Sequence, residues 1–256
     1  MSVLDHAAGN PMEIEEHAAA PLAGGVVNYG YQCGMLWGAA LAAGAQAYHL
    51  HGPGPKAETV SIVAAQRLVE SFRAKYKYID CLEISDLNLK GKIHTGKMLK
   101  FLVKGGPLRC FGMSPGCARM SLKEINAALA DTNIEVPPPP VSCVSLLLQK
   151  MGASEMHTVM AAGFAGGIGL SGDGCGALGA AVWKLAMQSR KKGEGNKDIN
   201  ARIGDMINKF LKVSDFKFEC AEIAGRRFEN ISDHAAYVRD GGCAKIIDFL
   251  AADYLK

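Results

Sequence analysis

Cysteine is scarce in this chain, and long basic runs are missing altogether. Eight cysteines among 256 residues fall well below the roughly 8–10% that marks a disulfide scaffold. Apolar residues make up 49% of the chain and charged residues 21%, which excludes a disordered or collagen-like protein. The net charge of +3 comes from 28 basic and 25 acidic residues. We therefore expect a small molecule, a metal or another protein as the partner, and no nucleic acid.

The start of the chain lacks positive charge. Its first 20 residues contain no Lys or Arg, whereas a secretory signal peptide begins with a basic region. We therefore expect a cytoplasmic location, where cysteines more often bind metals or act as redox thiols than form structural disulfides. The apolar segment from Thr158 to Trp183 is long enough to span a membrane, but eight glycines interrupt it. It predicts a buried helix, a glycine-rich turn and a second helix, with no membrane span.

An internal repeat organises the sequence. Its three anchors recur at offsets of 142, 139 and 126, a decreasing series that loop-length changes within a duplicated unit would produce. The first anchor is Ala23-Gly24-Gly25 followed by Cys33-Gly34, matching Ala165-Gly166-Gly167 followed by Cys175-Gly176; the others are Cys81 with Cys220 and Cys117 with Cys243. We therefore predict two copies of one unit.

The boundary between the copies is predicted at Pro137 to Pro140, a run that can be neither helix nor central strand. The units are then 1–136 and 141–256, with an insertion at 86–108 in the first. Helical apolar stripes run from Ile62 to Tyr76 and from Ile199 to Phe210, and Arg190 to Lys197 is a connecting loop. No alternating strands stand out. We predict an all-α fold of two tandem, internally duplicated helical units packed together.

The second unit contains a set of four separated cysteines, Cys143, Cys175, Cys220 and Cys243. Cys175 lies at the end of a glycine-rich turn and directly before an apolar segment. A helix N-terminus lowers the pKa of a thiol, so we expect Cys175 to be the reactive thiolate. The small Gly174, Gly176 and Gly179 beside it allow another backbone or a flat inorganic group to approach closely.

This order of cysteines and glycines resembles the C-GCAxxG-C-C family of redox-active proteins over residues 141–256. The motif here reads Gly174-Cys175-Gly176-Ala177-Leu178-Gly179, with Cys143 before it and Cys220 and Cys243 after it. One departure is Gly176, where the family name has alanine. The resemblance implies a redox role through a cysteine-bound iron–sulfur centre or a dithiol, without a defined substrate.

The first unit looks like a degenerate copy of this motif. Gln32 and Trp37 replace two motif glycines, and Met1 stands where a leading cysteine would match Cys143. Three cysteines remain, Cys33, Cys81 and Cys117. A further cysteine, Cys110, has no counterpart and could supply a fourth ligand to a second site.

Three hypotheses remain open at this point. In the first, the second unit's four cysteines hold an iron–sulfur cluster for electron transfer or redox sensing with a partner protein. The absence of short C-x-x-C pairs requires that such a cluster be assembled by tertiary packing. In the second, Cys175 is the attacking thiolate of a thiol–disulfide oxidoreductase that binds no metal, and one of the other three cysteines resolves the mixed disulfide. In the third, the chain is a non-enzymatic helical interaction module with structural or zinc-binding cysteines. The cluster type, the oligomeric state and enzymatic activity stay open.

Overall fold

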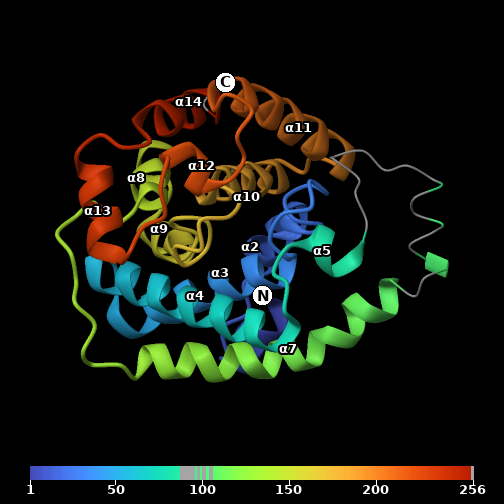
Figure 1. Cartoon of the computed structure of the whole chain (residues 1–256), viewed down its shortest axis with the longest axis horizontal. Coiled ribbons are helices and arrows are strands. Elements are labelled where there is room, and N and C mark those ends of the chain that lie inside the picture. The colour runs from blue at the N-terminus through green and yellow to red at the C-terminus, as the bar shows by residue number, and fades with distance from the viewer. Residues whose placement is uncertain (87–95, 97–98, 100–101, 104–105, 255–256) are drawn as a thin grey trace.

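The computed structural model describes residues 1–86, 96, 99, 102–103 and 106–254 (Figure 1). Within these ranges the chain is helical, and its only strand-like pairings are two isolated bridges. The all-α prediction is confirmed. The helices are α1 (Ser2–Ala7), α2 (Glu13–Ala18), η1 (Ala20–Leu22), α3 (Gly34–His51), α4 (Pro55–Tyr76), α5 (Cys81–Ser85), α7 (Gly106–Leu129), α8 (Cys143–Lys150), α9 (Glu155–Ala162), α10 (Gly176–Lys191), α11 (Asn196–Val213), α12 (Cys220–Ala224), α13 (Ile231–Arg239) and α14 (Ala244–Tyr254).

The predicted helices lie where the apolar stripes place them. The two stripes fall inside α4 and α11, and the glycine-rich segment is a turn between α9 and α10. Among the described residues, no helix combines the length and apolarity needed to cross a membrane. The loop predicted at Arg190 to Lys197 was too long, because α10 continues to Lys191 and α11 begins at Asn196. Most of the insertion at 86–108 lies outside the described residues.

The duplication is visible in the order of the helices. The first unit's α1 to α5 correspond to α8 to α12 of the second, and the starts of α2 and α3 lie 142 residues before those of α9 and α10. The units differ after that point. The single long α7, along the lower edge of Figure 1, corresponds to the two shorter helices α13 and α14.

The two units exchange one helix each. Helix α2 of the first unit packs against α10 of the second, and α9 of the second packs against α3 of the first. Where the exchanged helices meet, His157 Nε2 lies 2.9 Å from Glu15 Oε1. These two residues are also 142 positions apart. Contact between equivalent residues is what a twofold relation between the units produces.

Two further pairs of equivalent residues meet between the units. The buried side chain of Gln32 donates from Nε2 to the carbonyls of Gly167 and Gly174, at 2.9 and 3.4 Å. The ring of Trp37 fills the space beside Gly179, where a Cβ would collide with it. Gln32 matches Gly174 and Trp37 matches Gly179 at the offset of 142. The large side chains of the first motif therefore occupy the space that the glycines of the second motif leave.

The core is centred on α3 and α10. Both helices are buried on nearly all sides, and Trp37 and Trp183 are fully buried within them. A helix that is apolar around its circumference requires neighbours on every side. The exchanged helices supply part of that cover. The residue boundaries of the two units at 136 and 141 stay a prediction.

Candidate redox site

Each cysteine of the second unit lies at a helix terminus. Cys143 is the first residue of α8, Cys175 is the N-cap of α10 and Cys220 is the first residue of α12. Cys243 directly precedes α14, rather than lying on it, and has a left-handed backbone with a φ of 60°. Four separate elements therefore contribute one sulfur each.

Backbone hydrogen bonds hold two of these termini together. The N–H of Cys175 donates to the carbonyl of Phe218 at 2.8 Å, and the N–H of Cys220 donates to the carbonyl of Asp173 at 2.7 Å. They flank one of the two isolated bridges, between Gly174 and Glu219. This cross-link places Cys175 and Cys220 side by side, although 45 residues separate them.

All four cysteines come together in one place. Burial raises the pKa of Cys220, and so do the charges of Cys175, Cys143 and Cys243. Charges act in this way only at short range in a poorly solvated space. Cys143, Cys175 and Cys220 are buried, whereas Cys243 is partly exposed. The four cysteines that the sequence analysis singled out therefore lie close enough to influence one another's pKa values.

The expected low pKa of Cys175 is wrong. Burial raises the pKa of this thiol to about 12, although the backbone N–H groups of Leu178 and Ala177 at the start of α10 lower it. Removal of the thiolate from water outweighs the favourable helix terminus. At neutral pH and without a compensating cation, Cys175 is therefore a neutral thiol.

Backbone N–H groups also point to Cys143. Burial raises the pKa of Cys143, and the charges of Cys243 and Cys175 raise it further, while hydrogen bonds from Gly166 and Val144 lower it. Together with the N–H groups at Cys175, these donors favour negatively charged sulfur. Gly166 belongs to the glycine-rich turn and adopts a φ of 63°, a left-handed conformation that glycine allows.

The three motif glycines face protein groups. A Cβ on Gly174 would lie 2.6 Å from Oε1 of Gln32, one on Gly176 would strike the carbonyl of Phe164, and one on Gly179 would strike the Trp37 ring. The lack of room beside Gly176 explains why glycine stands where the family name has alanine. A contact of these glycines with a cofactor stays a prediction.

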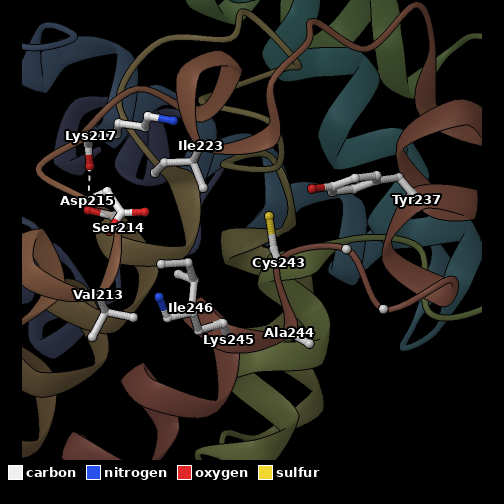
Figure 2. A pocket seen from close by; sticks show the side chains of 12 residues that line it. Val213, Ser214, Asp215, Lys217, Ile223, Tyr237, Cys243, Ala244, Lys245 and Ile246 are labelled. Carbon is white, nitrogen blue, oxygen red and sulfur yellow. Dashed lines mark hydrogen bonds between the residues drawn. The ribbon is translucent and has the colours of Figure 1, made fainter.

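Cys243 connects the cysteine set with solvent. Its sulfur lies between Ile223 and Tyr237 at a pocket of about 330 Å³ (Figure 2). The Tyr237 hydroxyl hydrogen-bonds to Cys243 and lowers its pKa, although burial raises that pKa more. Lys217 and Lys245 also line the pocket. The sequence analysis did not identify Tyr237, because its proximity to Cys243 depends on the break between α13 and α14.

The first unit brings its own cysteines together. The pKa of Cys33 is raised to about 12, mainly by burial. The charges of Cys81, Cys117 and Cys110 also raise it, whereas the N–H of Met35 lowers it. Cys33 and Cys117 are buried, while Cys81 and Cys110 are partly exposed. The eight cysteines thus form two sets of four, and all eight are free thiols.

The spacing of the side chains matters for the type of metal. In the described part of the chain, no three His, Cys, Asp or Glu side chains are grouped so that they could hold a single metal ion. This arrangement gives no support to a zinc site. An iron–sulfur cluster distributes its four cysteines over several iron atoms and is itself larger than one ion. Four cysteine thiols, with N–H donors directed to two of them, are the type and number of ligands that such a group uses.

Comparison with known protein families gives a match to both halves of the chain. The sequence model of a family described as "Putative redox-active protein (C_GCAxxG_C_C)" matches residues 1–123 and 141–254. The two matched segments agree with the duplicated halves. Searches among curated proteins and among solved structures gave no match.

Proposed function

The chain belongs to the C_GCAxxG_C_C family of redox-active proteins, and we propose that its second unit acts in electron transfer or redox sensing through an iron–sulfur cluster. Cys143, Cys175, Cys220 and Cys243 would be the ligands. The observation that supports this proposal best is that three other thiols, each from a different helix terminus, lie close enough to Cys220 to raise its pKa.

The raised pKa values of these cysteines set a requirement for a bound metal, which has to displace the thiol protons. Burial raises the pKa of all four thiols, so the metal-free site holds neutral sulfur at neutral pH. Four thiolates in such a space repel one another unless positive charge compensates them. Iron ions supply that charge, and cysteine thiolate is the ligand that iron–sulfur clusters use.

The surrounding residues have distinct roles in this proposal. When bound, the cluster supplies a one-electron redox couple. The N–H groups of Gly166, Val144, Ala177 and Leu178 donate toward the sulfurs, which stabilises negative charge and raises the reduction potential. The buried Phe164 and Trp37, stacked edge to face at 4.6 Å, exclude water from the adjoining core.

Anaerobic purification of the full chain, followed by reconstitution with iron and sulfide, tests the proposal. We expect a brown protein with bound iron and acid-labile sulfide. The variant Cys220→Ser should lose the iron held by this set, while Ser232→Ala on α13 should retain it. A chain that stays colourless after reconstitution, with all eight thiols still titratable, would refute the cluster.

A second candidate, thiol–disulfide exchange, is favoured by the position of Cys243. This sulfur is the partly exposed one of the set, contacts Tyr237 and borders the pocket. Its thiolate would attack a small disulfide, forming a mixed disulfide and releasing one half as a thiol. Cys175 would then attack the sulfur of Cys243, giving an internal disulfide and the second thiol. The chain is oxidised by two electrons and the substrate disulfide is reduced.

Reaction with a small aromatic disulfide separates the two candidates. In a metal-free chain whose partly exposed Cys81 and Cys110 are replaced by serine, thiol exchange predicts fast release of the coloured thiol. The further change Cys243→Ser should slow this release at least tenfold. The variant Tyr237→Phe should slow the reaction less, because it removes one hydrogen bond to the thiolate. Equal rates with and without the further change Cys243→Ser would exclude this role.

A further inference from the structure

The first unit repeats the cross-link that holds the second unit's cysteines. The N–H of Cys33 donates to the carbonyl of Ile79 at 2.8 Å, and the N–H of Cys81 donates to the carbonyl of Tyr31 at 2.7 Å. The bridge between Gln32 and Asp80 lies in the same place as the bridge between Gly174 and Glu219. Cys33 and Cys81 therefore have the backbone surroundings of Cys175 and Cys220.

The long helix α7 brings two more sulfurs to this place. It packs against α3, α4 and α5, and it is tied to α4 by hydrogen bonds from Lys75 to the carbonyl of Gly116 and from Tyr76 to that of Met113, at 3.1 and 3.2 Å. Cys117 is buried. Cys110 precedes it by seven residues, close to two helical turns, so both lie on the same face of α7.

The other three cysteines of this unit lie near Cys33. The charges of Cys81, Cys117 and Cys110 all act on Cys33, and Cys110 also acts on Cys81. Cys110 therefore reaches the set from one end of α7, although it has no counterpart in the second unit. The first unit, like the second, has four cysteines. They lie on three elements, because α7 carries both Cys117 and Cys110.

We propose that Cys33, Cys81, Cys110 and Cys117 form a second iron–sulfur site, in which Cys110 replaces the leading cysteine that this unit lacks. The site takes its class of cofactor from the function proposed above but uses none of the same cysteines. Its partly exposed Cys81 and Cys110 leave it more open than the set around Cys175. A protein partner would therefore reach this site more readily.

The two sites are neighbours through the contact between the units. Cys33 follows Gln32 in the chain and Cys175 follows Gly174, and the side chain of Gln32 donates to the carbonyl of Gly174. One side-chain hydrogen bond thus connects the segments that carry the two sets.

Iron content after anaerobic reconstitution tests this site. We expect Cys110→Ser and Cys175→Ser each to retain about half the iron and sulfide of the intact chain, with different electron paramagnetic resonance signals. The double variant should bind none. The matched control is Ser114→Ala, an exposed position one turn from Cys110 on α7, which should retain all the iron.

Alkylation provides a readout that does not depend on iron counting. Loading should protect Cys110 from iodoacetamide in the intact chain and in Cys175→Ser, but not in Cys33→Ser. Full iron in Cys110→Ser, or alkylation of Cys110 at the same rate before and after loading, would overturn the second site. Loss of iron in Cys175→Ser down to zero, in a chain that circular dichroism shows to be folded, would also overturn it. If only the proposal for the second unit is wrong, Cys175→Ser keeps all the iron and Cys110→Ser keeps none.

Discussion

The two units share a backbone plan but differ in the positions of their cysteines. In each, one cysteine caps a long central helix and another opens a five-residue helix, and paired hydrogen bonds join the two segments. The third shared cysteine differs in setting, because Cys117 lies within the continuous α7 while Cys243 lies in the break before α14. The backbone thus fixes where two sulfurs lie, and the remaining helices decide which others join them and how exposed they are.

The same comparison changes the meaning of the degenerate motif. In the sequence alone, Gln32 and Trp37 indicate that the first unit has lost two of the motif glycines. In the structure they fill the space beside Gly174 and Gly179. Equivalent positions meet where the units are in contact, and two large side chains could not both fit there. In each pair of equivalent positions, one large residue packs against one glycine.

The largest expected effect comes from emptying the space beside Gly179. Trp37 is fully buried, and Trp37→Ala should lower the free energy of unfolding by about 3–5 kcal/mol because it leaves a cavity. Gly179→Ala alone should also destabilise the chain, since its methyl group would strike the Trp37 ring. Urea denaturation of both variants and the double variant measures the coupling.

In this cycle, Gly179→Ala should cost less in the Trp37→Ala background, by at least about 1 kcal/mol. Additive losses would show that the two equivalent positions do not share space.

A second comparison concerns the glycines that follow the capping cysteines. Gly176→Ala should lower the free energy of unfolding by about 3 kcal/mol, because the methyl group meets the backbone carbonyl of Phe164. Its counterpart Gly34→Ala should cost about 1 kcal/mol, since the nearest atom is the Ala23 Cα at 2.9 Å. Thermal denaturation gives the ranking, and a larger loss for Gly34→Ala would contradict it.

The control for this pair is Gly204→Ala in α11, where a Cβ would meet nothing within 4 Å. Here alanine should stabilise the chain by about 0.5–1 kcal/mol through its better helix propensity.

Each unit contains a buried group whose contribution to the free energy of unfolding should change with pH, in opposite directions in the two units. In the second unit, burial lowers the pKa of His234 to about 4, while Asp233 raises it. The unfolded chain binds this proton near pH 6.5, so stability that is complete above that pH is lost as the pH falls toward 4. We expect a loss of about 2–3 kcal/mol between pH 7.5 and 4.5.

Urea denaturation at the two pH values should show that this loss is absent in His234→Gln and retained in His49→Gln, an exposed position. An unchanged pH dependence in His234→Gln would assign the effect to other groups.

The smallest effect concerns Asp80, next to Cys81 in the first unit. Burial, together with the charges of Asp173, Glu83 and Glu219, raises the pKa of Asp80 to about 7, although Arg73 acts in the opposite direction. Because the folded pKa exceeds the unfolded value, the stability present below about pH 4 is lost as the pH rises to 7. Asp80→Asn should therefore stabilise the chain at pH 8 by about 1–2 kcal/mol, a value reduced for solvent screening.

Chemical denaturation at pH 5 and pH 8 tests this prediction, with Glu70→Gln at an exposed position of α4 as the control. A gain of equal size at both pH values would indicate a different cause, such as a new hydrogen bond.

Much of the architecture could be predicted from the pattern of residues. The stripe from Ile62 to Tyr76 specifies α4 because its period matches a helix, and the glycines after Gly163 exclude one continuous membrane helix. The recurrence of Cys33 and Cys81 as Cys175 and Cys220 predicted the duplication, and the matched family segments agree with it. Each of these features is local in sequence or repeats at a fixed offset.

Features that depend on contacts between the units were beyond prediction. No local pattern shows that α2 and α9 exchange partners, or that Glu15 meets His157. The pKa of Cys175 was expected to fall because the helix terminus is visible in the sequence, whereas the burial that raises it is not. Cys110 was identified as a spare cysteine, but its approach to Cys33 depends on how α7 packs.

The pairing of Trp37 with Gly179 has a consequence for how such a chain can diverge. Two separate identical subunits would carry one and the same amino acid at both positions, so a bulky aromatic opposite a hydrogen atom could never occur there. Joining the copies in a single polypeptide removes that restriction. Each half is then free to change in response to the other, at the contact and at the cysteines alike.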